Sequence, residues 1–159
     1  MQKTYLCIDL KSFYASVECV ELGLDPFKVN LVVADPTRGG GAITLAATPA
    51  IKKLGVSSRG RIFEIDPKIE YMIAPPRMHL YMEYSCKVYK VFLEFIAKED
   101  IHVYSIDESF LDVTSYLKLY QVNAKELAKK ILDRIYEKTG LTATVGIGTN
   151  LYLAKIAMD

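Results

Sequence analysis

Short apolar runs alternate along the chain with segments of helical spacing, and glycine, proline or polar residues separate them. The run YLCI at residues 5–8 is typical of a buried strand, and Ser12 is placed to cap a helix over about 13–22. On the same criteria we expect further strands at 30–34, 42–46, 71–74, 103–107, 110–113 and 142–147. Further helices are expected at 49–54, 78–98, 124–138 and after Asn150.

The order of these elements indicates the fold class. A strand and a helix come first, a mixed segment follows, and the chain closes with helix, two strands, helix, strand and helix. Two strands paired in a hairpin around residues 107–109, with helices packed on one face, predict an α+β fold of the ferredoxin-like, split-βαβ type.

The amino-acid composition excludes some classes of function. The chain has 159 residues and a net charge of +1, which neither requires nor excludes nucleic acid. Three cysteines without a C-x-x-C pair, and two histidines distant from them, argue against a zinc site or a disulfide framework. With no signal peptide pattern and no apolar stretch long enough to span a membrane, we expect a cytoplasmic protein.

Three acidic residues stand beside apolar strand segments. Asp9 follows the first apolar run, and Asp107 and Glu108 lie between two others. Asp9 alone is better explained as a capping or turn residue, and Asp107 with Glu108 alone as ordinary surface residues of a hairpin turn. The basic residues nearest in sequence to Asp107 and Glu108 are Lys98 and Lys118. If the three acids meet without a cation, they repel one another, and a divalent cation removes that repulsion. Oxygen ligands favour Mg²⁺, and two such ions about 3.5–4 Å apart can assist phosphoryl transfer.

The stretch between Asp35 and Glu64 contains no acidic residue. It opens with three consecutive glycines and carries five basic residues: Arg38, Lys52, Lys53, Arg59 and Arg61. A lobe that contacts a polyphosphate or a nucleic-acid backbone and an ordinary solvated basic surface both fit this pattern. The glycines do not form a phosphate-binding loop of the Walker type, because the G-x-x-x-x-G-K-[ST] spacing is absent.

Three segments resemble the motifs of Y-family translesion DNA polymerases, in the order of that family. They are IDLKSFYASVE at 8–18, YSIDESFLD at 104–112, and VGIGTN continuing to LAKIA at 145–157. The resemblance is greatest to the bacterial branch of mutagenesis-type polymerases that act in the SOS response. It implies that Asp107 and Glu108 are catalytic and that Asp9, Asp107, Glu108 and the Leu10 carbonyl bind two Mg²⁺ ions.

The resemblance also implies a nucleotide site. The amides of Phe13 and Tyr14 would approach the triphosphate, Lys155 would bind it, and the Tyr14 ring would be the steric gate that rejects ribonucleotides. The family often carries a Tyr-x-x-Arg pair in the fingers, whereas this chain has Pro49 and Lys52 there. Lys52 is expected to bind nucleotide as a point charge, without the bidentate geometry of arginine.

The implied organisation is a palm at 1–10 and 77–159, incomplete at its C-terminal end, with fingers at 11–76 and with thumb and little finger absent. The implied function of the full-length protein is template-directed synthesis past damaged bases in DNA repair, and we expect the fragment alone to be inactive. Primer–template DNA and deoxynucleoside triphosphates are the expected partners, with a sliding clamp or recombinase recruited through absent C-terminal parts. The expected location is cytoplasmic and nucleoid-associated.

Two alternatives remain open from the sequence. One is a palm-type nucleotidyl cyclase, but the chain lacks the Gly-Gly-[Asp/Glu]-Glu-Phe hairpin of such enzymes. The other is a degenerate polymerase-like module that binds nucleotide or DNA without catalysis, but the intact acids argue against it.

Overall fold

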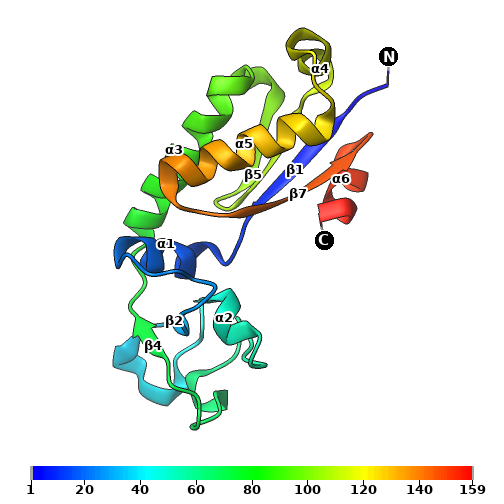
Figure 1. Cartoon of the computed structure of the whole chain (residues 1–159). Coiled ribbons are helices and arrows are strands. Elements are labelled where there is room, and N and C mark those ends of the chain that lie inside the picture. Colours follow the sequence, from blue (N-terminus) through cyan, green and yellow to red (C-terminus); the bar gives the residue numbers. More distant parts are fainter. Residues whose placement is uncertain (1, 159) are drawn as a thin grey trace. The chain divides into compact units, whose positions relative to one another are not determined.

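A computed structural model describes residues 2–158 of the chain. The chain forms two compact units: residues 1–10 with 82–159, here called the sheet unit, and residues 11–81, here called the inserted unit (Figure 1). The sequence-based division placed its second boundary at residues 76 and 77. The assignment of these units as palm and fingers stays a prediction.

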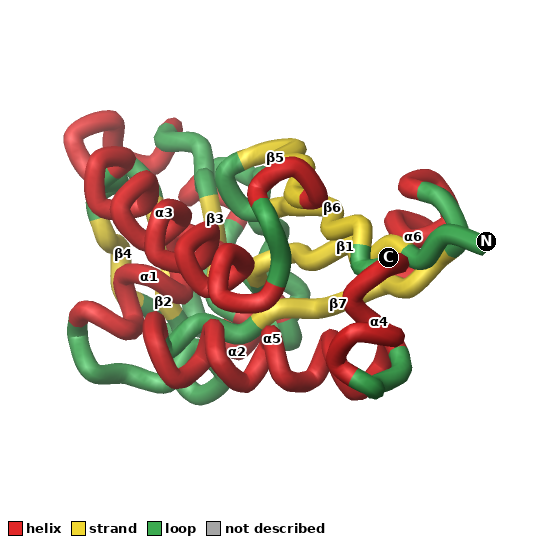
Figure 2. The backbone as a smooth tube through the Cα atoms, turned by 90° about the horizontal axis from the view of Figure 1, so that it is seen from above, coloured by secondary structure: helices red, strands yellow, loops and turns green. Residues whose placement is uncertain are grey.

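The sheet unit is built on four strands in the order β5-β6-β1-β7, with every neighbouring pair antiparallel. Their bounds are β1 Tyr5–Leu10, β5 Ile101–Ser105, β6 Glu108–Asp112 and β7 Ala143–Gly148. They lie side by side in the view of Figure 2. The helix α3 lies between β1 and β5 in the chain, and β6 inserts between these two strands in the sheet. This arrangement is the split βαβ of a ferredoxin-like fold. The predicted α+β class is confirmed.

Helices cover the two faces of this sheet unequally. The helices α3 (Met78–Phe95) and α5 (Ala124–Thr139) lie on one face, whereas α6 (Leu151–Met158) lies on the other (Figure 1). Alternation along β1 explains the division, since successive side chains of a strand point to opposite faces. Ile8 and Leu10 line a pocket together with Val88 of α3, while Cys7 packs with residues of β6 and α6.

The inserted unit combines α1 (Phe13–Glu21), a three-stranded sheet and the short helix α2 (Pro49–Lys52). Its strands β2 (Leu31–Val33), β3 (Ala46–Ala47) and β4 (Met72–Ala74) have the order β3-β2-β4, with β2 antiparallel to β3 and parallel to β4. A core of four buried residues holds the unit together: Val32, Ala47, Ile51 and Ile65.

Several predicted elements differ from the structure. The strand expected at 42–46 is wrong, because only Ala46–Ala47 pairs with β2 and Ile43 makes no more than an isolated bridge with Arg61. The preceding glycine stretch forms the 3₁₀ helix η1 (Pro36–Gly41), whose first turn the Asp35 side chain caps by accepting from the Thr37 amide.

Helix ends and short helices account for the other differences. The helix expected to reach residue 98 ends at Phe95, and a 3₁₀ turn, η3 (Lys98–Asp100), follows it. A second 3₁₀ turn, η2 (Ile62–Glu64), and the helix α4 (Thr114–Tyr120) were not predicted. Ser12 does precede α1, but its left-handed backbone (φ 45°, ψ 52°) gives no side-chain cap. Within residues 2–158, every helix is too short or too polar to cross a membrane.

Candidate active site

Two of the predicted acids face each other across the central strand pair of the sheet unit. Asp9 on β1 stands directly opposite Glu108 on β6, with Thr144 of β7 on its other side. Paired residues of an antiparallel ladder project to the same face, so both carboxylates belong to the face that carries Cys7 and α6. Asp107 precedes Glu108 in the β5–β6 turn, and the Leu10 amide donates a hydrogen bond to its carbonyl, 2.8 Å away.

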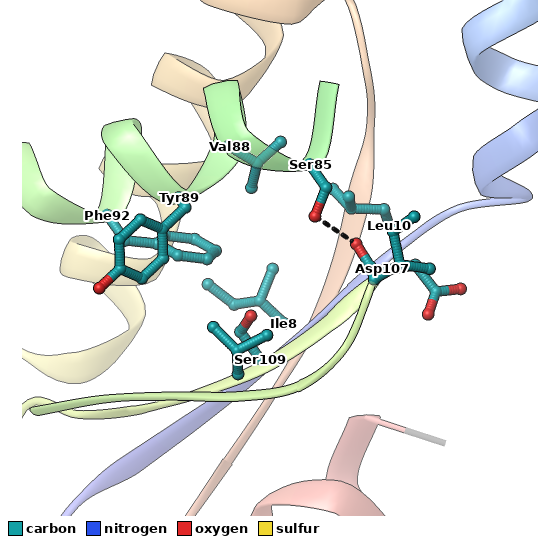
Figure 3. A pocket seen from close by; sticks show the side chains of 10 residues that line it. Ile8, Leu10, Ser85, Val88, Tyr89, Phe92, Asp107 and Ser109 are labelled. Atoms are coloured by element: carbon teal, nitrogen blue, oxygen red, sulfur yellow. Dashed lines mark hydrogen bonds between the residues drawn. The ribbon is translucent and has the colours of Figure 1, made fainter. Parts of the chain in front are cut away.

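Two hydrogen bonds hold the turn that carries Asp107. Ser85 on α3 donates its hydroxyl to the Ile106 carbonyl at 2.7 Å (Figure 3). The Ser105 hydroxyl donates to Asp107 Oδ1 at 2.9 Å. Figure 3 also shows the Asp107 carboxylate directed away from the apolar pocket that Ile8 and Val88 line. The side chain of Asp107 is therefore held at the outer rim of a packed core.

A lysine from the last helix pairs with Glu108. Lys155 Nζ on α6 lies 2.6 Å from Glu108 Oε1 and 4.9 Å from the centre of the Tyr104 ring. The Cys7 thiol approaches the same Glu108 oxygen, at 3.5 Å. Burial, reinforced by the charge of Glu108, raises the pKa of the Cys7 thiol to about 12, so this thiol remains protonated at neutral pH.

Two glycines on β7 make this pairing possible. A Cβ atom on Gly146 or Gly148 would overlap the backbone of α6, so their absence of a side chain lets α6 pack directly on the strand. Sequence reasoning considered only the basic residues nearest in sequence and missed the contact between Lys155 and Glu108. The signal that was available is the G-x-G pattern at 146–148, whose second glycine stands three positions before the first residue of a helix that carries a lysine.

The donor atoms at this end of the sheet suit a hard cation. They are the carboxylates of Asp9, Asp107 and Glu108 and the Leu10 carbonyl, all oxygen, which is the donor type that Mg²⁺ prefers. With Glu108 drawn to Lys155, however, no three Asp, Glu, His or Cys side chains among residues 2–158 are grouped closely enough to hold a metal. The role of these four residues as metal ligands stays a prediction.

In the inserted unit, the Tyr14 ring stacks on the Tyr81 ring. Their centroids are 4.5 Å apart and their planes differ by 15°. Phe13 packs edge-on against Tyr81 at 6.4 Å. The Tyr81 hydroxyl donates to Glu18 at 2.7 Å, and Arg77 binds both carboxylate oxygens of Glu18. Sequence reasoning assigned Glu18, Arg77 and Tyr81 no role in the site. This network connects them to Tyr14, the residue predicted as the steric gate.

The remaining nucleotide-binding candidate also lies in the inserted unit. Lys52, at the C-terminal end of α2, donates from its Nζ to the Ser12 hydroxyl at 2.9 Å. The structure therefore places Lys52 beside the residue that precedes Phe13 and Tyr14. The nucleotide-binding roles of Phe13, Tyr14, Lys52 and Lys155 stay predictions.

Comparison with known families identifies the group to which the chain belongs. A family model described as the impB/mucB/samB family matches residues 8–159, which include all three motif segments. The chain belongs to this family. The resemblance to Y-family polymerases that the motifs predicted is thereby confirmed.

Three of the relatives that the chain resembles come from Bacillus subtilis (strain 168). The putative UV-damage repair protein UvrX is 42% identical over 161 residues, which covers 99% of this chain and 37% of UvrX. DNA polymerase IV 2 is 39% identical, with 99% of this chain and 38% of the relative covered. The DNA repair protein homolog YozK is 42% identical over 109 residues, 67% of this chain and 93% of YozK. The chain thus spans under two fifths of the length of the first two relatives.

Solved structures of the same kind share the fold. The crystal structure of DinB from Sulfolobus solfataricus superposes with a TM-score of 0.79 and 30% sequence identity, covering 96% of this chain and 44% of DinB. An insertion ternary complex of Dbh DNA polymerase gives a TM-score of 0.80 at 30% identity and the same coverage. The fold of this impB/mucB/samB chain is therefore that of part of a Y-family polymerase.

Proposed function

We propose that this chain supplies the catalytic palm and fingers of a translesion DNA polymerase. The reaction is template-directed transfer of a nucleotide from a deoxynucleoside triphosphate to a primer 3′-hydroxyl, past damaged bases. The observation that supports it most directly is the register that sets Asp9 opposite Glu108, with Asp107 in the adjoining turn and Lys155 on the same face. Family members named DNA polymerase IV add support.

The acidic and the basic residues have different roles in this reaction. Asp9, Asp107, Glu108 and the Leu10 carbonyl would hold two Mg²⁺ ions, which supply charge stabilisation to the attacking and leaving oxygens of phosphoryl transfer. Lys155 exchanges its contact with Glu108 for the triphosphate, and Lys52 and the amides of Phe13 and Tyr14 bind its oxygens. The Tyr14 ring occupies the space that a ribose 2′-hydroxyl would need. Catalysis rests mainly on positioning and electrostatics.

The partners of this proposed polymerase are primer–template DNA and deoxynucleoside triphosphates, in the cytoplasm at the nucleoid. We further propose that a sliding clamp or a recombinase recruits the polymerase. Because the chain spans only 37% of UvrX and 38% of DNA polymerase IV 2, we expect it to bind nucleotide but to give little or no primer extension alone.

Nucleotide binding by this chain tests the proposal. A deoxynucleoside triphosphate should bind in the presence of Mg²⁺ and much more weakly with a chelator, and Asp107→Ala should abolish the Mg²⁺-dependent part. Asp133→Ala, on the exposed side of α5, is the matched control and should bind like the wild type. Equal binding by Asp107→Ala and the wild type in calorimetry would contradict the assignment.

The same preparation separates the alternatives. A nucleotidyl cyclase would convert one nucleotide to a cyclic product without DNA, which chromatography detects. A binding module without catalysis would give no primer extension even as part of the full-length protein. We expect no cyclic product, and we expect primer extension by the full-length protein that Asp107→Ala abolishes.

A further inference from the structure

Glu18 is an almost fully buried carboxylate in the inserted unit. Glu18 is 3% exposed and lies on α1, one turn beyond Tyr14. Arg77 donates from Nη2 to Oε1 at 2.5 Å and from Nε to Oε2 at 3.1 Å. The Tyr81 hydroxyl donates to Oε2 at 2.7 Å. Burying a charge is costly, so the buried ion pair of Glu18 and Arg77 adds little to the free energy of unfolding. Its main effect is to fix the orientation of the side chains that it contacts.

Tyr81 connects this carboxylate to the Tyr14 ring. The Tyr81 side chain is completely buried, and its ring stacks on Tyr14 with centroids 4.5 Å apart. Phe13 packs against the edge of Tyr81 at 6.4 Å and 63°. Tyr81 is thus fixed at its hydroxyl end by Glu18 and at its ring edge by Phe13. One face of the Tyr81 ring packs on the Tyr14 ring, with only 15° between the two planes, so the plane of Tyr81 sets the plane of Tyr14.

Arg77 fixes the orientation of the carboxylate. A guanidinium that contacts both oxygens of Glu18 leaves the carboxylate one rotational position, and Oε2 then faces the Tyr81 hydroxyl. Burial, followed by the hydrogen bond to Glu18, raises the pKa of the Tyr81 phenol, so its hydroxyl keeps the proton that it donates. The contacts form a chain from Arg77 through Glu18 and Tyr81 to Tyr14.

We propose that Arg77, Glu18 and Tyr81 are positioning residues that hold the Tyr14 ring where it excludes a ribose 2′-hydroxyl. This inference rests on the proposed function and deepens it. Rejection by steric overlap depends on a rigid wall, because a ring that can tilt away admits the extra hydroxyl. Sugar selectivity is therefore set by the buried network behind the ring as well as by the ring.

The ratio of deoxyribonucleotide to ribonucleotide affinity tests this inference. We expect Tyr81→Phe, which keeps the stack and loses the hydroxyl, to lower the ratio of dATP to ATP affinity by about fivefold, the equivalent of one hydrogen bond. Glu18→Gln should act in the same direction. The dATP affinity itself should change much less than the ratio. An unchanged ratio in both variants would overturn the inference.

A double variant separates positioning from a general structural effect. If Tyr81 acts through Tyr14, then adding Tyr81→Phe to Tyr14→Ala should leave the ratio where Tyr14→Ala alone sets it. Additive effects would contradict the chain of contacts. Tyr116→Phe is the matched control, because Tyr116 also donates its hydroxyl to a carboxylate, that of the partly buried Asp100, at 2.6 Å, but in the sheet unit. This control should leave the ratio unchanged.

A measurement without nucleotide makes the two proposals distinguishable. In proton NMR spectra, the wild type should show contacts between the Tyr14 and Tyr81 rings, and Glu18→Gln should weaken them. Wild-type chain that shows these contacts and binds dATP no better than ATP would overturn the role in sugar selection alone. Wild-type chain that binds neither triphosphate with Mg²⁺ would overturn the proposed function and the sugar selection together.

Discussion

Burial separates the three cysteines of the chain. Cys7 and Cys19 are completely buried, whereas Cys86 on α3 is exposed. Burial, followed by the charges of Asp25 and Glu18, raises the pKa of the Cys19 thiol to about 11. An unfolded thiol loses its proton near pH 8.5. Between these values the unfolded chain binds fewer protons than the folded chain, so this contribution to stability is present below pH 8.5 and is lost as pH rises.

The expected outcome is a measurable difference between variants at alkaline pH. Raising the pH from 8 to 10 should lower the free energy of unfolding of the wild type more than that of Cys19→Ala, by on the order of 1 kcal/mol. Urea denaturation at the two pH values gives this difference. Cys86→Ala is the control and should follow the wild type. Parallel behaviour of Cys19→Ala and the wild type would show that the buried thiol does not contribute.

The residues of the candidate site were predictable to different degrees. Asp9, Asp107 and Glu108 stand inside continuous sequence motifs, so the sequence alone singles them out. Their partners come from far along the chain: Lys155 is 47 positions from Glu108, and Tyr81 is 63 positions from Glu18. Such contacts depend on the packing of the folded chain, and neither periodicity nor spacing reveals them.

Among the elements, the approach of α6 to β7 depends on two missing side chains. Gly146→Ala would place a Cβ against the backbone of α6, which cannot move away as the end of a flexible side chain would. We expect this change to lower the free energy of unfolding by about 3 kcal/mol and to remove the ion pair between Lys155 and Glu108. Gly41→Ala is the control, since a Cβ there meets nothing within 4 Å. Equal stability of the two variants would contradict the close packing.

Elements with a buried face were predicted more reliably than those without one. The helix α5 presents Leu127, Ile131 and Ile135 at helical spacing, and this stripe predicted it within one residue at its C-terminal end. The helix α4 buries no residue, so its sequence lacks the apolar stripe from which a helix is predicted. Strand β3 has two residues, and its place beside β2 depends on long-range pairing and on the Thr48 hydroxyl that binds the Leu31 amide.

At the scale of the molecule, the candidate residues are distributed over both compact units. The acids and Lys155 belong to the sheet unit, while Tyr14 and Lys52 belong to the inserted unit. The motif order in the sequence predicted that these groups act together, because the family resemblance connects them. Within each unit, the sheet register and the aromatic stack supply the local geometry that the sequence did not contain.

The distribution of charge leads to a prediction about the DNA binding that we propose for this chain. Net charge is +1, but the five basic residues between Asp35 and Glu64 stand without an acidic neighbour in that stretch. Each phosphate neutralised adds about −0.9 to the slope of log affinity against log salt. If this stretch provides the contacts, the slope of duplex binding should therefore be no steeper than about −4.5, and affinity should be weak at physiological salt.

Charge reversal locates these contacts. Lys53→Glu with Arg59→Glu should flatten the slope by about two phosphate contacts and lower affinity at low salt by more than tenfold. Both side chains are exposed, so the fold should tolerate the change. The control is Lys129→Glu with Lys130→Glu on the exposed side of α5, which changes the net charge equally. Equal losses in the two double variants, measured by fluorescence anisotropy, would show that net charge and not the basic stretch governs binding.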